Sequence, residues 1–219
     1  MKLAIFDFDG TLLMKDTLPL LGQEWLRQGK SRYRFWQTWI RCSPPLILYK
    51  LGLMPQEKMK VRIMAQFHTI FKNMTRVEID LFFNKAYPGI ARHFNPRVLE
   101  ELQRARSQGF HCVLLSGTYA QMLNIVAEEL GFDSVIAADI HYRDGKVNLK
   151  SQLAAIDGPV KLTLLQEVFA GENINWFLSR AYGDSYADIN VMQMTGEPVA
   201  VNPEERLAEY ARSRGWKII

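Results

Sequence analysis

The chain has 219 residues, of which 48% are hydrophobic and 23% charged, which is the balance of an ordinary globular protein. This composition excludes a disordered chain, and the two cysteines, Cys42 and Cys112, are too few for the disulfide framework of a small secreted protein. The net charge of +4 is unevenly spread, because residues 25–56 hold six basic side chains and no acidic one. This segment therefore favours an anionic partner.

Two apolar stretches are relevant to where the protein works. The N-terminal run 3–6 meets Asp7 at once and is too short for a signal peptide. The most apolar later stretch, 46–54, is interrupted by Lys50 and is too short to cross a membrane. We therefore expect a cytoplasmic protein and leave peripheral contact with an anionic membrane open.

Short apolar runs alternate with helical patterns along most of the chain. In chain order, we expect strands over 2–6, 110–115, 135–138, 180–182, 198–201 and 216–219, with a hairpin over 142–147 around an Asp-Gly turn. We expect helices over 96–107, 120–130, 160–169 and 203–214. Asn95 is the N-cap of the first of these helices and Gly109 lies just past its end, while the second ends before Gly131.

Strands that alternate with helices predict an α/β fold, with a Rossmann-like, doubly wound parallel sheet covered by helices on both faces. Such a sheet binds ligands at the carboxyl ends of its strands. Residues 17–86 break the alternation, since they are helical and rich in aromatic and basic side chains. We therefore predict a core domain of residues 1–16 and 87–219 and an inserted helical cap domain of residues 17–86.

Two carboxylates, Asp7 and Asp9, follow the first predicted strand directly. Residues two apart on a strand share a face, so both can point into one site. Close like charges repel, and a divalent cation removes the conflict; oxygen ligands suit Mg²⁺. Gly10 permits a tight turn that lets backbone amides approach a bound anion. By itself, the pattern also has a simpler explanation, which is a strand that ends in a solvated acidic turn.

Two later segments place polar groups after predicted strands. Ser116, in a Ser-Gly-Thr run, could hold a phosphate oxygen with help from the N-terminus of the next helix, or could simply cap that helix. Asp184 can supply a further metal ligand, and Asp188 would lie one helical turn away on the same face. The simpler alternative is a pair of acids favoured at a helix N-terminus.

A cation is needed to neutralise these carboxylates and a bound phosphoryl group. Lys161 begins the predicted helix after a Gly-Pro pair and is the favoured residue. Lys150 and Lys146 compete with it, although Lys146 fits a solvated hairpin better.

Together these motifs resemble the haloacid dehalogenase (HAD) superfamily of phosphohydrolases, in subfamily IB, the branch similar to phosphoserine phosphatase. The motifs occur in family order and span the chain from Lys2 to Met192. The resemblance implies the HAD fold with a helical cap of the C1 type between the first and second motifs. It also implies a Mg²⁺-dependent phosphatase, that is, a phosphoric monoester hydrolase.

The resemblance also assigns roles to residues. Asp7 would attack phosphorus and form an aspartyl-phosphate, and Asp9 would protonate the leaving oxygen and then activate water. Mg²⁺ would be held by the Asp7 carboxylate, the backbone carbonyl of Asp9 and the Asp184 carboxylate, with Asp188 in support. The phosphoryl oxygens and substrate would be oriented by further residues, namely Gly10, Thr11, Ser116, Gly117, Thr118 and Lys161.

Substrate choice is expected to depend on the cap. Asp16 stands where phosphoserine phosphatases resemble one another in having a glutamate for the substrate amine, and Arg62 looks like the arginine that meets the carboxylate. Asp16 is shorter than glutamate, and Ala187 replaces an asparagine of the closer phosphoserine enzymes, so both weaken an amino-acid substrate. We expect a small phosphorylated metabolite and leave a phosphoserine-like one open.

Two alternatives remain open. In residues 31–42, Phe35, Trp36, Trp39 and Ile40 could share a helix face opposite basic residues, either packing the cap on the core or docking it on anionic lipid, as would suit a lipid phosphate phosphatase. The other alternative is a non-catalytic, anion-binding protein of the same fold. The basic segment lacks a nucleic-acid module, so no nucleic acid is expected. The oligomeric state stays open.

Overall fold

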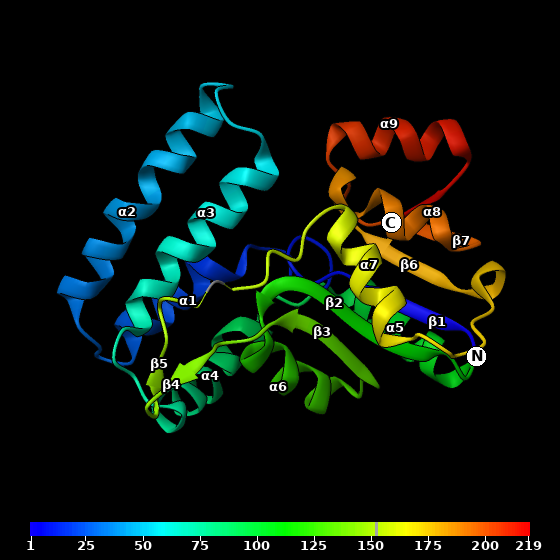
Figure 1. Cartoon of the computed structure of the whole chain (residues 1–219). Helices are drawn as coiled ribbons and strands as arrows, with labels where there is room; N and C mark the ends of the chain where they lie inside the picture. The colour runs from blue at the N-terminus through cyan, green and yellow to red at the C-terminus, as the bar shows by residue number, and fades with distance from the viewer. Residues whose placement is uncertain (152) are drawn as a thin grey trace.

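The computed structural model describes residues 1–151 and 153–219, and the centre of these is a six-stranded sheet (Figure 1). The strands lie in the order β3-β2-β1-β6-β7-β8, and every pairing is parallel. Their bounds are β1 Leu3–Phe6, β2 His111–Tyr119, β3 Ser134–Ala138, β6 Arg180–Gly183, β7 Glu197–Ala200 and β8 Lys217–Ile218. The chain winds outward in both directions from the central pair β1 and β6, which confirms the predicted doubly wound α/β fold.

Helices cover both faces of the sheet because neighbouring strand residues point to opposite sides. Phe6 of β1 packs with residues of α5 (Pro96–Ser107) and α6 (Ala120–Leu130). Ile5, one residue earlier, packs on the other face with α7 (Pro159–Val168), α8 (Ile189–Met194) and α9 (Glu205–Arg214). The sheet is thus buried from both sides, as an all-parallel sheet requires.

The local signals in the sequence act as expected. The Asn95 side chain accepts a hydrogen bond from the amide of Arg97 at the start of α5, and Gly131 ends α6 in the left-handed conformation. The predicted hairpin is present as β4 (Tyr142–Arg143) paired with β5 (Lys146–Val147). Most other bounds differ from prediction by one or two residues.

The segment between β1 and α5 is helical, as predicted. It contains α1 (Thr17–Arg27), α2 (Arg32–Lys50), α3 (Gln56–His68), a short 3-10 turn η1 (Thr69–Phe71) and α4 (Arg76–Ala91). Trp25 of α1 and Phe82 of α4 meet edge to face, and Phe71 meets Tyr119 of β2 in the same way, so aromatic packing ties this segment to the sheet.

The boundary predicted after residue 86 falls inside α4, which continues to Ala91. The division into core and cap domains stays a prediction. In Figure 1, α2 and α3 form a hairpin that extends away from the sheet, with α2 outermost. No helix among residues 1–151 and 153–219 is long and apolar enough to cross a membrane.

Candidate active site

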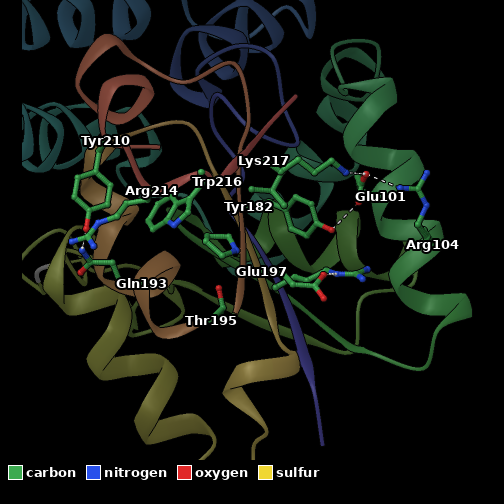
Figure 2. A pocket seen from close by; sticks show the side chains of 15 residues that line it. Glu101, Arg104, Tyr182, Gln193, Thr195, Glu197, Tyr210, Arg214, Trp216 and Lys217 are labelled. Carbon is green, nitrogen blue, oxygen red and sulfur yellow. Dashed lines mark hydrogen bonds and ion pairs between the residues drawn. The ribbon is translucent and has the colours of Figure 1, made fainter. Parts of the chain in front are cut away.

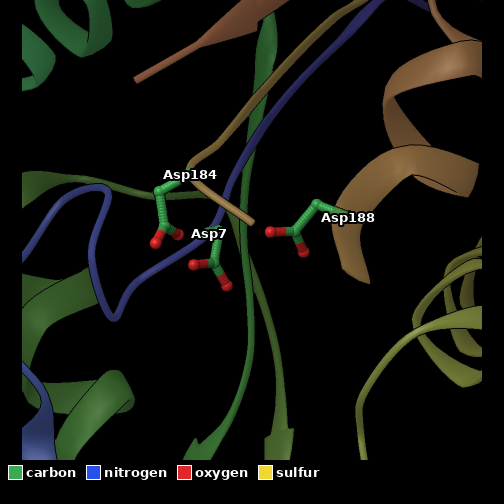
Figure 3. Close-up of side chains that lie close together, drawn as sticks. All are labelled: Asp7, Asp184 and Asp188. Atoms are coloured by element: carbon green, nitrogen blue, oxygen red, sulfur yellow. The ribbon is translucent and has the colours of Figure 1, made fainter. Parts of the chain in front are cut away.

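Three carboxylates meet at the carboxyl ends of the central strands (Figure 3). Phe6 of β1 pairs with Tyr182 of β6, so Asp7 and Asp184 emerge side by side where the strand order reverses. The Asp7 amide donates to the carbonyl of Tyr182 at 3.0 Å, which fixes this level. Asp188 ends the 3-10 turn η3 (Tyr186–Asp188), and oxygen atoms of the three aspartates lie within 4.8 Å of one another.

A buried lysine joins two of these carboxylates. The Lys161 ammonium donates to Oδ1 of Asp7 and to Oδ1 of Asp188, each at 2.6 Å, and only 5% of the residue is exposed. Lys161 lies in the first turn of α7, where a cation opposes the helix dipole, so the two carboxylates must offset both this and its desolvation. Lys146 and Lys150, by contrast, are exposed.

Burial raises the pKa values of carboxyl groups in the cluster. Burial raises the pKa of Asp7 to about 6 against the opposing effect of Lys161. Burial and the charge of Asp7 raise the pKa of Asp184 to about 8. One ammonium is therefore too little positive charge for three carboxylates at this depth.

A divalent cation fits this donor set. The three side chains offer only oxygen atoms, which suits Mg²⁺. In the described part of the chain, the second carboxylate oxygen of Asp7 has no hydrogen-bond donor, so it is free to face an ion. Asp7 and Asp184 would hold the ion by their side chains, while Asp188 is held by Lys161.

Asp9 lies beside the cluster but bonds elsewhere. Its carboxylate accepts a hydrogen bond from the Thr17 amide at 2.7 Å and another from the Thr17 hydroxyl, at the start of α1. Burial raises the pKa of Asp9 to about 7 against these bonds, and the charges of Asp7 and Asp16 also raise it. Its predicted backbone contact to a metal stays a prediction.

The turn after Asp9 is shaped by Gly10 and Thr11. Gly10 has φ +84°, and a Cβ at this position would collide with the Asp184 carboxylate, so only glycine fits. The buried Thr11 hydroxyl donates to Oδ1 of Asp184 at 3.2 Å. The first motif therefore orients Asp184 as well as supplying Asp7.

The second motif differs from the prediction. The strand that we expected to end at residue 115 continues as β2 to Tyr119, with a register shift after Leu115, and α6 starts only at Ala120. Ser116 therefore cannot use the helix N-terminus or cap it. The strand continues because β2 pairs in parallel with β3, and a local sequence pattern does not reveal pairing between distant residues.

The residues of this motif nevertheless lie at the same edge of the sheet as Asp7, because Phe6 pairs with Leu114. The buried Ser116 hydroxyl accepts a hydrogen bond from the Thr118 amide at 3.3 Å. A Cβ on Gly117 would lie 2.7 Å from the carbonyl oxygen of Ile156, so the loop before α7 covers this motif closely. The buried Thr118 hydroxyl has no partner among the described residues.

The two cap residues predicted to bind substrate, Asp16 and Arg62, differ in how near they lie to the site. Asp16 is exposed, with a carboxylate near enough to Asp9 to affect its pKa. Arg62 is also exposed, and no contact of the described chain places it in the cluster. Lys60 was missed: it is exposed as well, but it lies near enough to Asp157 and Asp7 for their charges to raise its pKa against the desolvation of its ammonium. Lys60 and Arg62 are two positions apart on α3, so they point to different sides of that helix.

A separate groove of about 710 Å³ lies along β7 and β8, away from the aspartates (Figure 2). Most of its charges are paired, since Glu101 accepts from Arg104 and Lys217. Arg180 pairs with Glu197 in the same way. The aspartate cluster is therefore the stronger candidate for chemistry.

Comparison with known proteins places the whole fold in one family. The model of the haloacid dehalogenase-like hydrolases matches residues 4–193. A relative from Streptomyces azureus named inhibition of morphological differentiation protein is 29% identical, over 99% of this chain and 77% of its own length. The histidinol-phosphatase of Neisseria meningitidis serogroup C is 25% identical, over 100% of this chain and 98% of its own.

Solved structures agree on the fold. A Bordetella pertussis protein of unknown function superimposes with a TM-score of 0.81 at 22% identity, covering 100% of this chain and 97% of its own. A substrate-bound phosphoserine phosphatase gives a TM-score of 0.67 at 20% identity, covering 100% and 92%. The resemblance predicted from the motifs is confirmed.

Proposed function

The chain belongs to the haloacid dehalogenase-like hydrolase family and is a phosphatase within it, and we propose that it hydrolyses a small phosphate monoester through an aspartyl-phosphate on Asp7, with Mg²⁺. The observation that carries this proposal is the buried cluster in which Lys161 bridges Asp7 and Asp188 while Asp184 lies within 4.8 Å. A solvated acidic turn would bury neither the lysine nor the carboxylates.

In the first step, a carboxylate oxygen of Asp7 attacks phosphorus. A bond forms between this oxygen and phosphorus as the bond from phosphorus to the leaving oxygen breaks. Asp9 gives its proton to that oxygen, and its raised pKa of about 7 suits a group that must be protonated near neutral pH. Thr17 holds the Asp9 carboxyl in place for the transfer.

In the second step, the Asp9 carboxylate takes a proton from water, and the resulting hydroxide attacks phosphorus. The bond to Asp7 breaks and releases inorganic phosphate, which restores both carboxyl groups. Bound Mg²⁺ would supply charge neutralisation for the transferring group. Lys161, Ser116 and the amide of Gly117 would steady the phosphoryl oxygens, which makes the second motif a binding element.

For the substrate, we propose a phosphate ester of a small amino alcohol. Phosphoserine and histidinol phosphate, the substrates in the names of two similar proteins, share a phosphate next to a primary amine. The exposed Asp16 carboxylate near Asp9 is a suitable partner for such an amine. Lys60, rather than Arg62, would meet a further anionic group. The cytoplasm is the proposed setting.

Lys60 and Arg62 provide a test of the cap contact. Lys60→Gln should raise KM for an anionic substrate with little change in kcat, because it removes attraction near the site without touching the reacting atoms. Arg62→Gln, the matched control, should leave both constants unchanged. The reverse result would restore the assignment made by family resemblance.

The catalytic proposal is tested by Asp7→Asn, which should abolish hydrolysis of p-nitrophenyl phosphate. Asp144→Asn is the matched control, since Asp144 is exposed in the β4-β5 turn at φ +52°, where asparagine is also tolerated. Rapid acid quenching with labelled substrate should trap phosphate on the wild type. Full activity of Asp7→Asn would eliminate the covalent mechanism, and inactivity of the wild type with Mg²⁺ would favour a non-catalytic anion-binding protein.

A further inference from the structure

Helix α2 has two apolar faces, and only one of them is used by the fold. The inner face contains Phe35, which packs against the core cluster, and the buried Thr38. Trp36 and Ile40, which the sequence suggested might share a face with Phe35, instead point outward and are 59% and 68% exposed. The α2 helix is therefore divided between packing and exposure.

The outward residues form a continuous stripe. Tyr33, Trp36, Ile40, Ile47 and Leu51 are all exposed and lie three, four or seven positions apart, so they share one side of the helix. At 1.5 Å per residue, the stripe is roughly 27 Å long. Leu53, 72% exposed in the turn before α3, extends it to the tip of the hairpin. Figure 1 shows this helix on the outside of the molecule.

Cations flank the stripe on both sides. Arg32 and Lys50 lie about five turns apart on one flank, and Arg34 and Arg41 lie on the other. Arg34 and Arg41 donate to neutral oxygens, the Lys72 carbonyl and the Thr69 hydroxyl. No basic residue of α2 forms an ion pair within residues 1–151 and 153–219, so none of these charges is held in a salt bridge there.

We propose that this face of α2, with the α2-α3 turn, docks on the surface of an anionic lipid membrane. Aliphatic and aromatic side chains flanked by arginine and lysine match the boundary between acyl chains and charged headgroups. The docking lies beyond the proposed phosphatase activity and does not depend on it. The helix would lie in the plane of the surface rather than across the membrane.

Charge complementarity favours lipid over a second copy of the chain. A two-fold dimer through this face would place the same surface against itself. Since residues 25–56 contain six basic and no acidic side chains, such a dimer would bring like charges together without partners. An anionic membrane supplies the missing negative charge and receives the apolar stripe at the same time.

The test is co-sedimentation of the full chain with vesicles of phosphatidylcholine alone or of equal parts phosphatidylcholine and phosphatidylglycerol. Binding should be at least about tenfold stronger to the anionic vesicles and should weaken with added salt. Arg32→Gln with Lys50→Gln should reduce partition about 25-fold, at about fivefold per charge. Lys85→Gln with Arg97→Gln, which removes two exposed charges elsewhere, should not reduce it comparably.

The contribution of the apolar stripe to membrane binding is tested by a second target variant and its matched control. Ile40→Asp with Ile47→Asp should abolish binding. The control, Val77→Asp with Phe177→Asp, adds the same charge elsewhere and should retain most of the binding. Val77 lies on α4 and is 75% exposed, and Phe177 lies on the 3-10 turn Trp176–Leu178 and is 82% exposed. Thermal unfolding checks that each variant folds. Equal binding to both vesicle types, no binding, similar losses in target and control variants, or a dimer in solution that Ile40→Asp dissociates would each overturn the proposal.

Discussion

Lys161→Met should remove the cation between Asp7 and Asp188 while keeping an unbranched side chain of similar length. The wild-type ammonium makes two charge-assisted hydrogen bonds of 2.6 Å, and all three side chains are at most 10% exposed. Methionine would leave these carboxylates facing each other, with Lys60 as the remaining positive charge that acts on Asp184. Both stability and catalysis should respond, for related electrostatic reasons.

The magnitudes follow from this burial. Removing one partner of a buried ion pair costs about 3–5 kcal/mol of unfolding free energy. We expect the lower end of that range, because the carboxylates can take up protons: burial already raises the pKa of Asp7 to about 6 and that of Asp184 to about 8. For catalysis, loss of one preorganised charged donor should lower kcat roughly 10²–10³-fold.

Lys150→Met is the matched control, since Lys150 is the lysine that sequence reasoning left as a competitor and is exposed. It should stay within about 0.5 kcal/mol of the wild type in stability and keep its kcat. Urea unfolding followed by circular dichroism gives the free energies, and p-nitrophenyl phosphate hydrolysis with Mg²⁺ gives kcat. If Lys161→Met kept wild-type kcat, or if Lys150→Met lost it, the assignment of Lys161 to the phosphoryl site would be wrong.

Three further outcomes are expected. Gly10→Ala should lower kcat at least about 100-fold, because its methyl group would displace the Asp184 carboxylate, whereas Gly145→Ala, at φ +74° with open space around it, should affect stability alone. Chelation should abolish hydrolysis, and Mg²⁺ should restore it and raise the Tm; activity that persists after exhaustive chelation would contradict the metal site. Burial and the charge of His141 lower the pKa of His68 from 6.5 to about 4, so the unfolded chain binds the extra proton between these values. The stabilising contribution of neutral His68 should thus be fully present above pH 6.5 and be lost, by about 3 kcal/mol, as the pH approaches 4, so the difference in unfolding free energy between the wild type and His68→Phe should change by that amount across this range.

Local signals were sufficient for most of the framework. Apolar runs that end abruptly in acidic or hydroxyl residues predict the strand ends, and this prediction puts Asp7 and Asp184 at one edge of the sheet, where the structure has them. The Asn95 cap and the glycine after α6 bounded helices correctly, because these interactions involve residues close in sequence. Parallel pairing then followed from the strand-helix alternation.

Features that depend on contacts between residues far apart in the chain could not be predicted from the sequence. The continuation of β2 to Tyr119 rests on pairing with β3, where Tyr119 lies opposite Ala138. The proposed choice of Lys60 over Arg62 depends on how close each lies to Asp7, which no sequence pattern within α3 specifies. Trp36 and Phe35 are adjacent and both aromatic, yet only the position of α1 decides that Phe35 is covered: a Cβ on Gly22 of α1 would lie 3.1 Å from its ring.

The charges of the cluster and of the cap fit together in one physical scheme. Asp7, Asp184 and Asp188 carry three negative charges against the one positive charge of Lys161, so the site is formally −2 and repels a phosphate dianion. A divalent cation brings it only to neutrality, which permits binding but supplies little attraction at a distance. The attraction must come from outside the sheet, and Lys60 on α3 lies near enough to Asp7 to contribute it. Under the proposed function, the α/β body would carry out the reaction, while Lys60 would help to attract the anionic substrate.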